Sequence, residues 1–150
     1  MYINYNEKFI NQLKKGEKYE LVLLKHLSHL KYQKMNGNFK PYDLKIYHQE
    51  KRYNTYEVKT DYQIHQYGNI AIEYECNNKP SGITTSTARY WAIFETFDEG
   101  YNLYIIPRKI IMKFIENKKF HKNVKGGDRM ASKLYLFKKD LFKEYIIHQV

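Results

Sequence analysis

The chain has 150 residues, a length that fits one domain able to bury a core around a central sheet. Lys and Arg number 26 against 16 Asp and Glu, and the resulting formal charge of +10 favours polyanionic partners, nucleic acid above all. AT-rich coding is a second source of such a composition. No apolar run approaches the ~20 residues that span a bilayer and no signal-peptide pattern is present, so we expect no membrane segment. A single cysteine, Cys76, excludes an intrachain disulfide and indicates an intracellular, reducing compartment.

The first predicted element is a helix over residues 6–32. Its apolar residues recur at steps of three and four, namely Phe9, Ile10, Leu13, Leu21, Leu24 and Leu27. Gly16 either lies inside this helix or separates two shorter ones, because glycine costs about 1 kcal/mol in a helix interior. Glu20 falls on or beside the apolar face and therefore needs a partner, for which a nearby lysine such as Lys25 is one candidate.

Residues 40–60 predict a β-hairpin, because two segments of alternating apolar and polar residues flank a charged connection. Glu57 and Lys59 are two apart and share a face of the second strand, and pairing of the strands can bring Asp43 beside them. Two carboxylates and one ammonium suit phosphodiester hydrolysis, in which oxygen ligands hold Mg²⁺ and a lysine stabilises charge or orients water. The alternative is a solvated hairpin face with a surface ion pair.

The rest of the chain alternates strands and helices. Residues 69–76 predict a strand with Ile70, Ile72, Tyr74 and Cys76 on one face, while Glu73 and Glu75 either front the site or face solvent. After a loop we expect a short helix over 83–89, strands over 90–97 and 101–106, a helix over 108–118, a strand over 133–138, and a closing helix or extension over 140–147.

Two segments carry candidate contacts to a DNA backbone. Thr84, Thr85 and Thr87 can donate to phosphate oxygens and Arg89 can pair with one, although hydroxyls in a short helix also back-bond to it. Residues 121–129 are basic, contain two glycines and lack apolar spacing. They predict either a phosphate-binding loop or a solvated one, with its cations at Lys122, Lys125 and Arg129.

Three motifs carry a resemblance to a known family. The first is Asp43 followed after thirteen residues by Glu57-Val58-Lys59, with proline at 41 rather than directly before the aspartate. The others are Gly16-x-x-x-Glu20 on the preceding helix and the small, hydroxyl-rich run over 80–91. Together they resemble the PD-(D/E)XK nuclease superfamily, in particular members related to Holliday-junction resolvases and those of phages and large viruses. The resemblance covers about 16–106 of a single 1–150 domain, with 107–150 as a C-terminal addition.

The resemblance implies an α/β fold with a restriction-endonuclease-like core, in which a helix, a three-stranded meander, a short helix and further strands precede a C-terminal helix and a basic extension. It implies a Mg²⁺-dependent deoxyribonuclease, with Mn²⁺ as substitute, in the cytoplasm of a bacterial cell or a viral host. Asp43, Glu57 and the Val58 carbonyl would bind one or two ions with Glu20, and Lys59 would act on the attacking water.

Several alternatives stay open. The partner would be DNA, for which linear ends, flaps, junctions and duplex sites are all candidates, and a junction-cutting homodimer is one form that the resemblance suggests. A catalytically inactive nucleic-acid-binding module would keep the basic surface without needing metal. A small basic interaction or structural protein would show neither cleavage nor salt-sensitive DNA binding.

Overall fold

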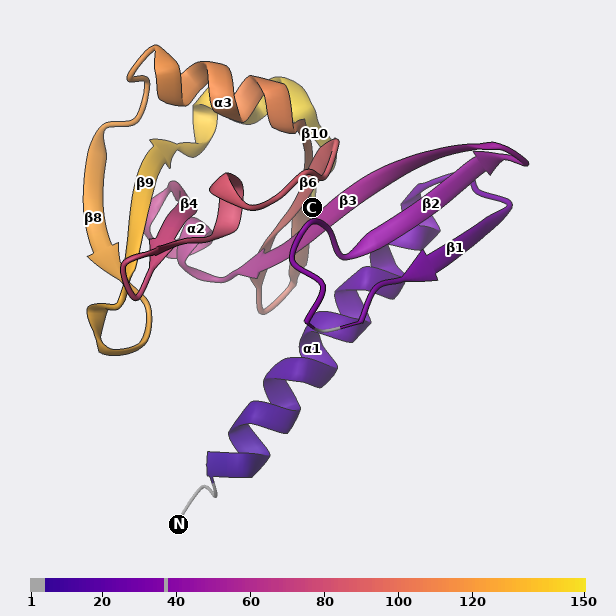
Figure 1. The fold of residues 1–150 in the computed structure, drawn as a ribbon, viewed down its shortest axis with the longest axis horizontal. Coiled ribbons are helices and arrows are strands. Elements are labelled where there is room, and N and C mark those ends of the chain that lie inside the picture. The colour runs from indigo at the N-terminus through magenta and orange to yellow at the C-terminus, as the bar shows by residue number, and fades with distance from the viewer. Residues whose placement is uncertain (1–4, 37) are drawn as a thin grey trace.

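The computed structural model describes the backbone of residues 5–36 and 38–150, and the side chains of these residues from 16 onward apart from Asp128. It is a mixed α/β protein built on two β-sheets (Figure 1). The first sheet has six strands in the order β1-β2-β3-β6-β7-β10, with bounds Lys31–Lys34, Leu44–Gln49, Arg52–Asp61, Tyr90–Phe97, Gly100–Pro107 and Ile146–His148. The second has four in the order β5-β4-β9-β8, with bounds Lys79–Pro80, Asn69–Cys76, Ser132–Lys138 and Lys122–Gly126.

In the described residues, three α-helices and three short 3₁₀ turns accompany the sheets. The helices are α1, Tyr5–His26, α2, Gln63–Tyr67, and α3, Arg108–Glu116. The turns are η1, Gly82–Thr84, η2, Asp128–Met130, and η3, Lys139–Tyr145. None of the described helices is long and apolar enough to cross a membrane.

The six-stranded sheet is mixed because β3 and β6 run parallel while the other neighbours run antiparallel. β6 lies between β3 and β7, and six of its eight residues are buried. A central strand covered on both faces reads as an almost continuous apolar run rather than an alternating one. Its sequence does so, which explains why the strand was predictable over 90–97.

One face of this sheet packs against α1. Leu23 and Leu24 of the helix contact a core that includes Leu44 and Ile46 of β2 and Phe94 of β6. The predicted helix therefore forms, but it runs without interruption through Gly16 and ends at His26.

The side chains of Phe9, Ile10 and Leu13 lie outside the described ones. Leu21, assigned to the apolar face, is 55% exposed. The extension of the helix to residue 32 was wrong, because Lys31–Lys34 forms the exposed edge strand β1.

The other face of the sheet packs against β4, β9, α3 and η3, around Ile70, Ile72, Trp91 and Phe137. Figure 1 shows these elements on one side of β6 and the β2–β3 hairpin with α1 on the other. The strand over 69–76 is confirmed, yet it pairs with β9 in the second sheet and not with β3. The three-stranded meander preceding η1 is β1-β2-β3 instead.

Three further predictions differ from the structure. Residues 122–126 form the edge strand β8, whose exposed face has no need of apolar side chains. The helix expected over 83–89 is only the turn η1, which Thr85 ends. The segment over 140–147, expected as a closing helix or extension, is the turn η3 followed by β10, so the α-helical alternative does not form. The helix over 108–118 is confirmed as α3, and the strands over 101–106 and 133–138 as β7 and β9.

Candidate functional site

Asp43 directly precedes β2 and is hydrogen-bonded to β3 on both sides of Glu57. Leu44, the next residue, pairs with Tyr56 of β3, and the Asp43 N–H donates to the Tyr56 carbonyl at 2.9 Å. The Val58 N–H in turn donates to Asp43 Oδ2 at 2.8 Å. This backbone contact fixes one carboxylate oxygen beside β3, so the orientation of Asp43 is set by the ladder itself.

Glu57 and Lys59 project from the face of β3 that points away from α1. Tyr56 and Val58, their neighbours along the strand, belong to the core under α1, and side chains alternate along a strand. Lys59 Nζ lies 3.4 Å from Glu57 Oε1. The Glu57 side chain is 13% exposed and that of Lys59 is 49% exposed. Asp43, Glu57 and Lys59 are thus brought together, as predicted.

The pKa of Glu57 lies close to neutral pH. Burial raises the pKa of Glu57 to about 7, with the Asp43 charge adding to the rise and Lys59 opposing it. A second cation at this position would favour the ionised form. Two carboxylates against one lysine leave the site short of positive charge, which is a suitable arrangement for a divalent cation with oxygen ligands.

Glu20 is held by a partner of its own. Its Oε2 lies 3.1 Å from Lys34 Nζ, and the same nitrogen is 3.5 Å from Glu17. Burial raises the pKa of Glu20, Lys34 opposes this, and the charge of Asp43 contributes to the rise. The partner is therefore Lys34 on β1 rather than Lys25. Among the described residues, no three Asp, Glu, His or Cys side chains gather closely enough to hold a metal ion.

The threonine-rich segment uses much of its hydrogen-bonding capacity internally. Thr84 Oγ1 donates to the Tyr74 carbonyl at 2.8 Å and Thr85 Oγ1 to the Gly82 carbonyl at 3.3 Å. Thr85 thus back-bonds to its own turn, in accord with the back-bonding alternative, whereas Thr84 bonds to the neighbouring strand β4. The Thr87 N–H donates to the Pro41 carbonyl at 2.8 Å, which ties the segment to the chain just before Asp43.

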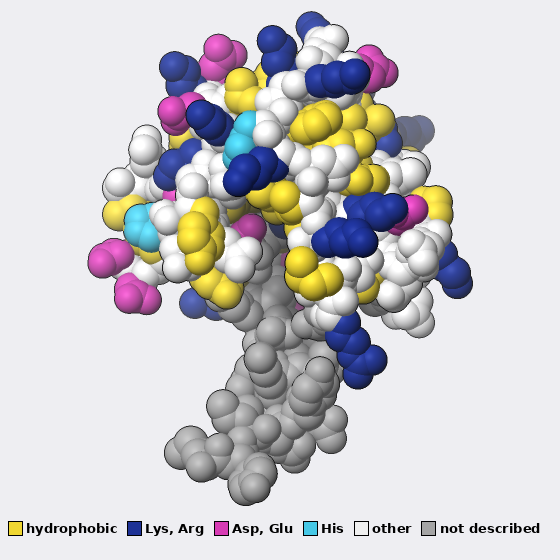
Figure 2. Space-filling view, turned by 90° about the vertical axis from the view of Figure 1, so that its left-hand side faces the viewer, with side chains coloured by type: hydrophobic (Ala, Val, Ile, Leu, Met, Phe, Trp, Pro, Cys, Tyr) yellow, Lys and Arg dark blue, Asp and Glu magenta, His cyan; other side chains and the backbone are white. Residues whose placement is uncertain are grey.

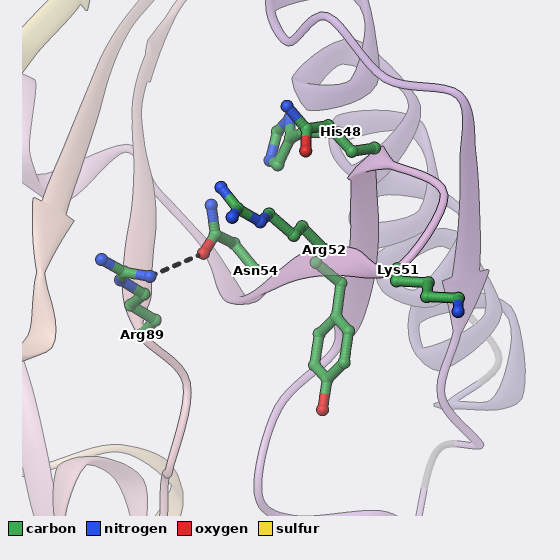
Figure 3. Close-up of a pocket in the computed structure, with 7 residues that line it drawn as sticks. His48, Lys51, Arg52, Asn54 and Arg89 are labelled. Carbon is green, nitrogen blue, oxygen red and sulfur yellow. Dashed lines mark hydrogen bonds between the residues drawn. The ribbon is translucent and has the colours of Figure 1, made fainter.

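Arg89 lines a cationic cleft at the tip of the hairpin. Its Nη1 donates to Asn54 Oδ1 at 3.1 Å and its N–H to Thr55 Oγ1 at 3.0 Å. The cleft measures about 530 Å³ (Figure 3), and the described residues that line it include no acidic one; they are His48, Gln49, Lys51, Arg52, Tyr53, Asn54 and Arg89.

A second hollow of about 500 Å³ is also lined by Arg89. It adds Thr87, Arg108 and Lys109, and its lining likewise has no acidic residue within the described part of the chain. The predictions had singled out Arg89 and Thr87, but they missed Lys51, Arg52 and Lys109. Lys51 and Arg52 lie at the turn and first residue of β3 and Lys109 lies at the start of α3, and the pairing of β3 with β6 places their two hollows next to Arg89.

The cations predicted for a loop lie elsewhere. Lys122 and Lys125 are exposed on β8, and Arg129 lies in η2 with a φ of 55°. On the face shown in Figure 2, Lys and Arg side chains are scattered among apolar ones rather than gathered in one band. An edge strand holds its cations at fixed spacing but presents no concave site.

Comparisons with models of known protein families, with curated proteins and with solved structures find no match to this chain.

Proposed function

We propose that the protein is a metal-dependent DNA endonuclease that hydrolyses phosphodiester bonds. One observation carries this proposal: Asp43 is hydrogen-bonded to the residues of β3 on both sides of Glu57, and Lys59 Nζ lies 3.4 Å from the Glu57 carboxylate. A carboxylate pair beside an amine on adjacent strands is the arrangement that such hydrolysis needs. The PD-(D/E)XK resemblance of the same residues points to the same chemistry.

The residues at the site would have two roles, which are binding of the metal ion and activation of the attacking water. Asp43, Glu57 and the Val58 carbonyl would hold Mg²⁺, with water filling the other positions. When bound, the ion supplies positive charge to the phosphate oxygens. Lys59 is half exposed and its Nζ lies 3.4 Å from Glu57, so it could orient a water or stabilise charge on the phosphate. Glu20 could bind the ion only by giving up its ion pair with Lys34.

Substrate binding would come from the cleft and the overall charge. Lys51, Arg52 and Arg89 line one concave surface, and Lys109 lines the adjoining hollow. Arginine forks suit phosphate oxygens, and a formal charge of +10 attracts DNA from a distance. Thr87 is exposed beside Arg89 and can add a hydroxyl contact.

The test is cleavage of supercoiled plasmid and of labelled branched DNA in Mg²⁺, Mn²⁺ or EDTA. Wild type should cut with either metal and not in EDTA, whereas Asp43→Asn and Glu57→Gln should not cut at all. Glu50→Gln, which changes an exposed carboxylate on the turn between β2 and β3, is the matched control and should retain full activity. Wild-type cleavage by Asp43→Asn would show that the site is assigned to the wrong residues.

A binding-only module is the second candidate, and the Glu20–Lys34 pair favours it. With Glu20 so engaged, the described residues offer no three-side-chain ligand group. A module of this kind would bind DNA through the cleft with a steep salt dependence and leave it intact in both metals. Cleavage that depends on Glu57 would exclude it.

A further inference from the structure

The outer face of the β1-β2-β3 sheet carries two tyrosine rings with lysines beside them. Leu44 and Ile46 of β2 point into the core under α1, so the alternating residues Lys45 and Tyr47 point the opposite way. Tyr53 of β3 pairs with Tyr47, and Lys31 of β1 pairs with Tyr47 from the other side. We call these four residues, Lys31, Lys45, Tyr47 and Tyr53, the tyrosine platform.

The rings and cations of the platform are in direct contact. The Tyr47 and Tyr53 ring centroids lie 5.4 Å apart. Lys45 Nζ is 4.0 Å from the Tyr53 centroid, and Lys31 Nζ is 4.6 Å from the Tyr47 centroid. Each ring is held by its neighbours, so little conformational freedom is lost when a ligand covers it.

No described element covers the platform in the way that α1 covers the opposite face. Tyr53 is 48% exposed and Lys31 is exposed. Figure 1 shows the β2–β3 hairpin extending away from the second sheet. Aromatic rings left open on a sheet, surrounded by cations, offer both a stacking surface and a positive field to a ligand.

The platform lies on the same sheet face as the candidate catalytic residues. Tyr53 and Glu57 are four residues apart on β3, and Tyr47 and Asp43 are four apart on β2, so each pair shares a face. At about 3.3 Å per residue the separation is on the order of 13 Å. A strand of a few nucleotides spans that distance.

From these contacts we infer that the tyrosine platform binds unpaired bases of a DNA strand whose backbone continues toward Asp43 and Glu57. Stacked rings with adjacent cations are the general means by which proteins hold single strands. Paired bases inside a duplex expose edges and phosphates but not faces, so the platform selects unpaired ones. That this strand is the substrate rests on the proposed nuclease function, whereas the binding itself does not.

The test measures binding in EDTA, where no metal-dependent cleavage takes place. Fluorescence anisotropy gives the affinity for a labelled single strand, for the duplex of the same sequence and for a single strand of abasic nucleotides. Wild type should bind the single strand at least ten-fold more tightly than the abasic strand, because each stacked base contributes about that factor. Equal affinity for the two would overturn the inference without any variant.

Variants then locate the binding surface. The double variant Tyr47→Leu/Tyr53→Leu should bind the single strand about ten-fold or more weakly, whereas Tyr47→Phe/Tyr53→Phe, which keeps the rings, should bind within about two-fold of wild type. The matched control Tyr62→Leu/Tyr67→Leu removes two tyrosines that are 61% and 65% exposed next to and within α2, and it should bind as wild type does. Thermal unfolding confirms that each variant is folded.

Each outcome bears on one of the two proposals. Retained affinity in the leucine variant, or an equal loss in the phenylalanine variant, would overturn the platform. Tighter wild-type binding to the duplex than to the single strand would do so as well. Platform-dependent binding without cleavage in Mg²⁺ would remove the nuclease and keep the platform. Cleavage that does not change in the leucine variant would keep the nuclease and overturn the inference that the bound strand continues into the catalytic site.

Discussion

The raised pKa of Glu57 makes a quantitative prediction for Glu57→Gln. Burial is the main cause of the rise from 4.5 to about 7. At about 1.4 kcal/mol per pH unit, the difference corresponds to about 3 kcal/mol of folding free energy. Glutamine resembles the protonated acid in shape and carries no charge, so the variant does not incur this cost.

The sign follows from the folded value lying above the unfolded one. Below pH 4.5 both states of the wild type hold the proton, and Glu57 carries no ionisation cost. Between pH 4.5 and about 7 the unfolded chain loses its proton first, so wild-type stability falls as the pH rises. Above pH 7 the full cost is present. Glu57→Gln should therefore match the wild type at pH 4 and exceed it by up to about 3 kcal/mol at pH 8.

Urea unfolding followed by Trp91 fluorescence at pH values from 4 to 8.5 measures this difference. Trp91 is 1% exposed and lies between the two sheets, so its emission should report global unfolding. Glu50→Gln is the control for removing one negative charge from a basic protein, and its difference from wild type should change little with pH. A Glu57→Gln difference that does not vary with pH would refute the reasoning. With 10 mM Mg²⁺ at pH 8, the proposed function also requires that wild type gain stability and that the variant not do so.

Three further predictions concern Lys59, the cleft and the buried Glu95. Lys59→Ala should lower cleavage by on the order of a hundredfold while Mn²⁺ binding by calorimetry survives, and a loss of affinity equal to that of Glu57→Gln would indicate a structural ion pair instead. Replacing Lys51, Arg52 and Arg89 by Gln should reduce the slope of log affinity against log salt by about two to three, since each phosphate contact contributes about 0.9. Neutralising Lys122, Lys125 and Arg129 should reduce it less, because these cations lie on the exposed edge strand β8 and the turn η2 outside the cleft, and an equal reduction would contradict this. Lys139→Met should cost about 2 kcal/mol, because it removes the 2.9 Å contact from Lys139 Nζ to the fully buried Glu95, which keeps the hydrogen bonds from Asn102 and Tyr104 and the 3.7 Å approach of His65 Nδ1. Burial would raise the pKa of Glu95, but the hydrogen bonds from Lys139 and Asn102 outweigh burial and lower that pKa. The ionised Glu95 therefore stabilises the fold at pH values above the pKa that this carboxyl has in the unfolded chain. As the pH falls through the lowered pKa of the folded state, wild type should lose the contribution of Lys139.

The elements that the sequence determined are those whose side chains repeat with a regular period. Ile70 and Ile72 alternate along β4, and α3 places Ile111 in the core at helical spacing. Because the period is a local property, strand or helix follows from neighbours in the chain. The placement of Glu57 and Lys59 on one face is determined in the same way, and Asp43 follows from the hairpin. The carboxylate and lysine group was therefore predictable.

The tertiary structure decided which strands and side chains far apart in the chain become partners. β1 is exposed at all four residues, so no alternation reveals it, and its pairing with β2 brings Lys34 to Glu20. β4 finds β9 more than fifty residues later, a choice that no local pattern encodes. The cleft depends on the parallel pairing of β3 with β6, which sets Arg89 beside Asn54. The side-chain pattern of a short segment indicates which of its faces are buried and which are exposed. It does not indicate which other segment will pack or pair with it, because that depends on the edges and faces that come together when the chain folds.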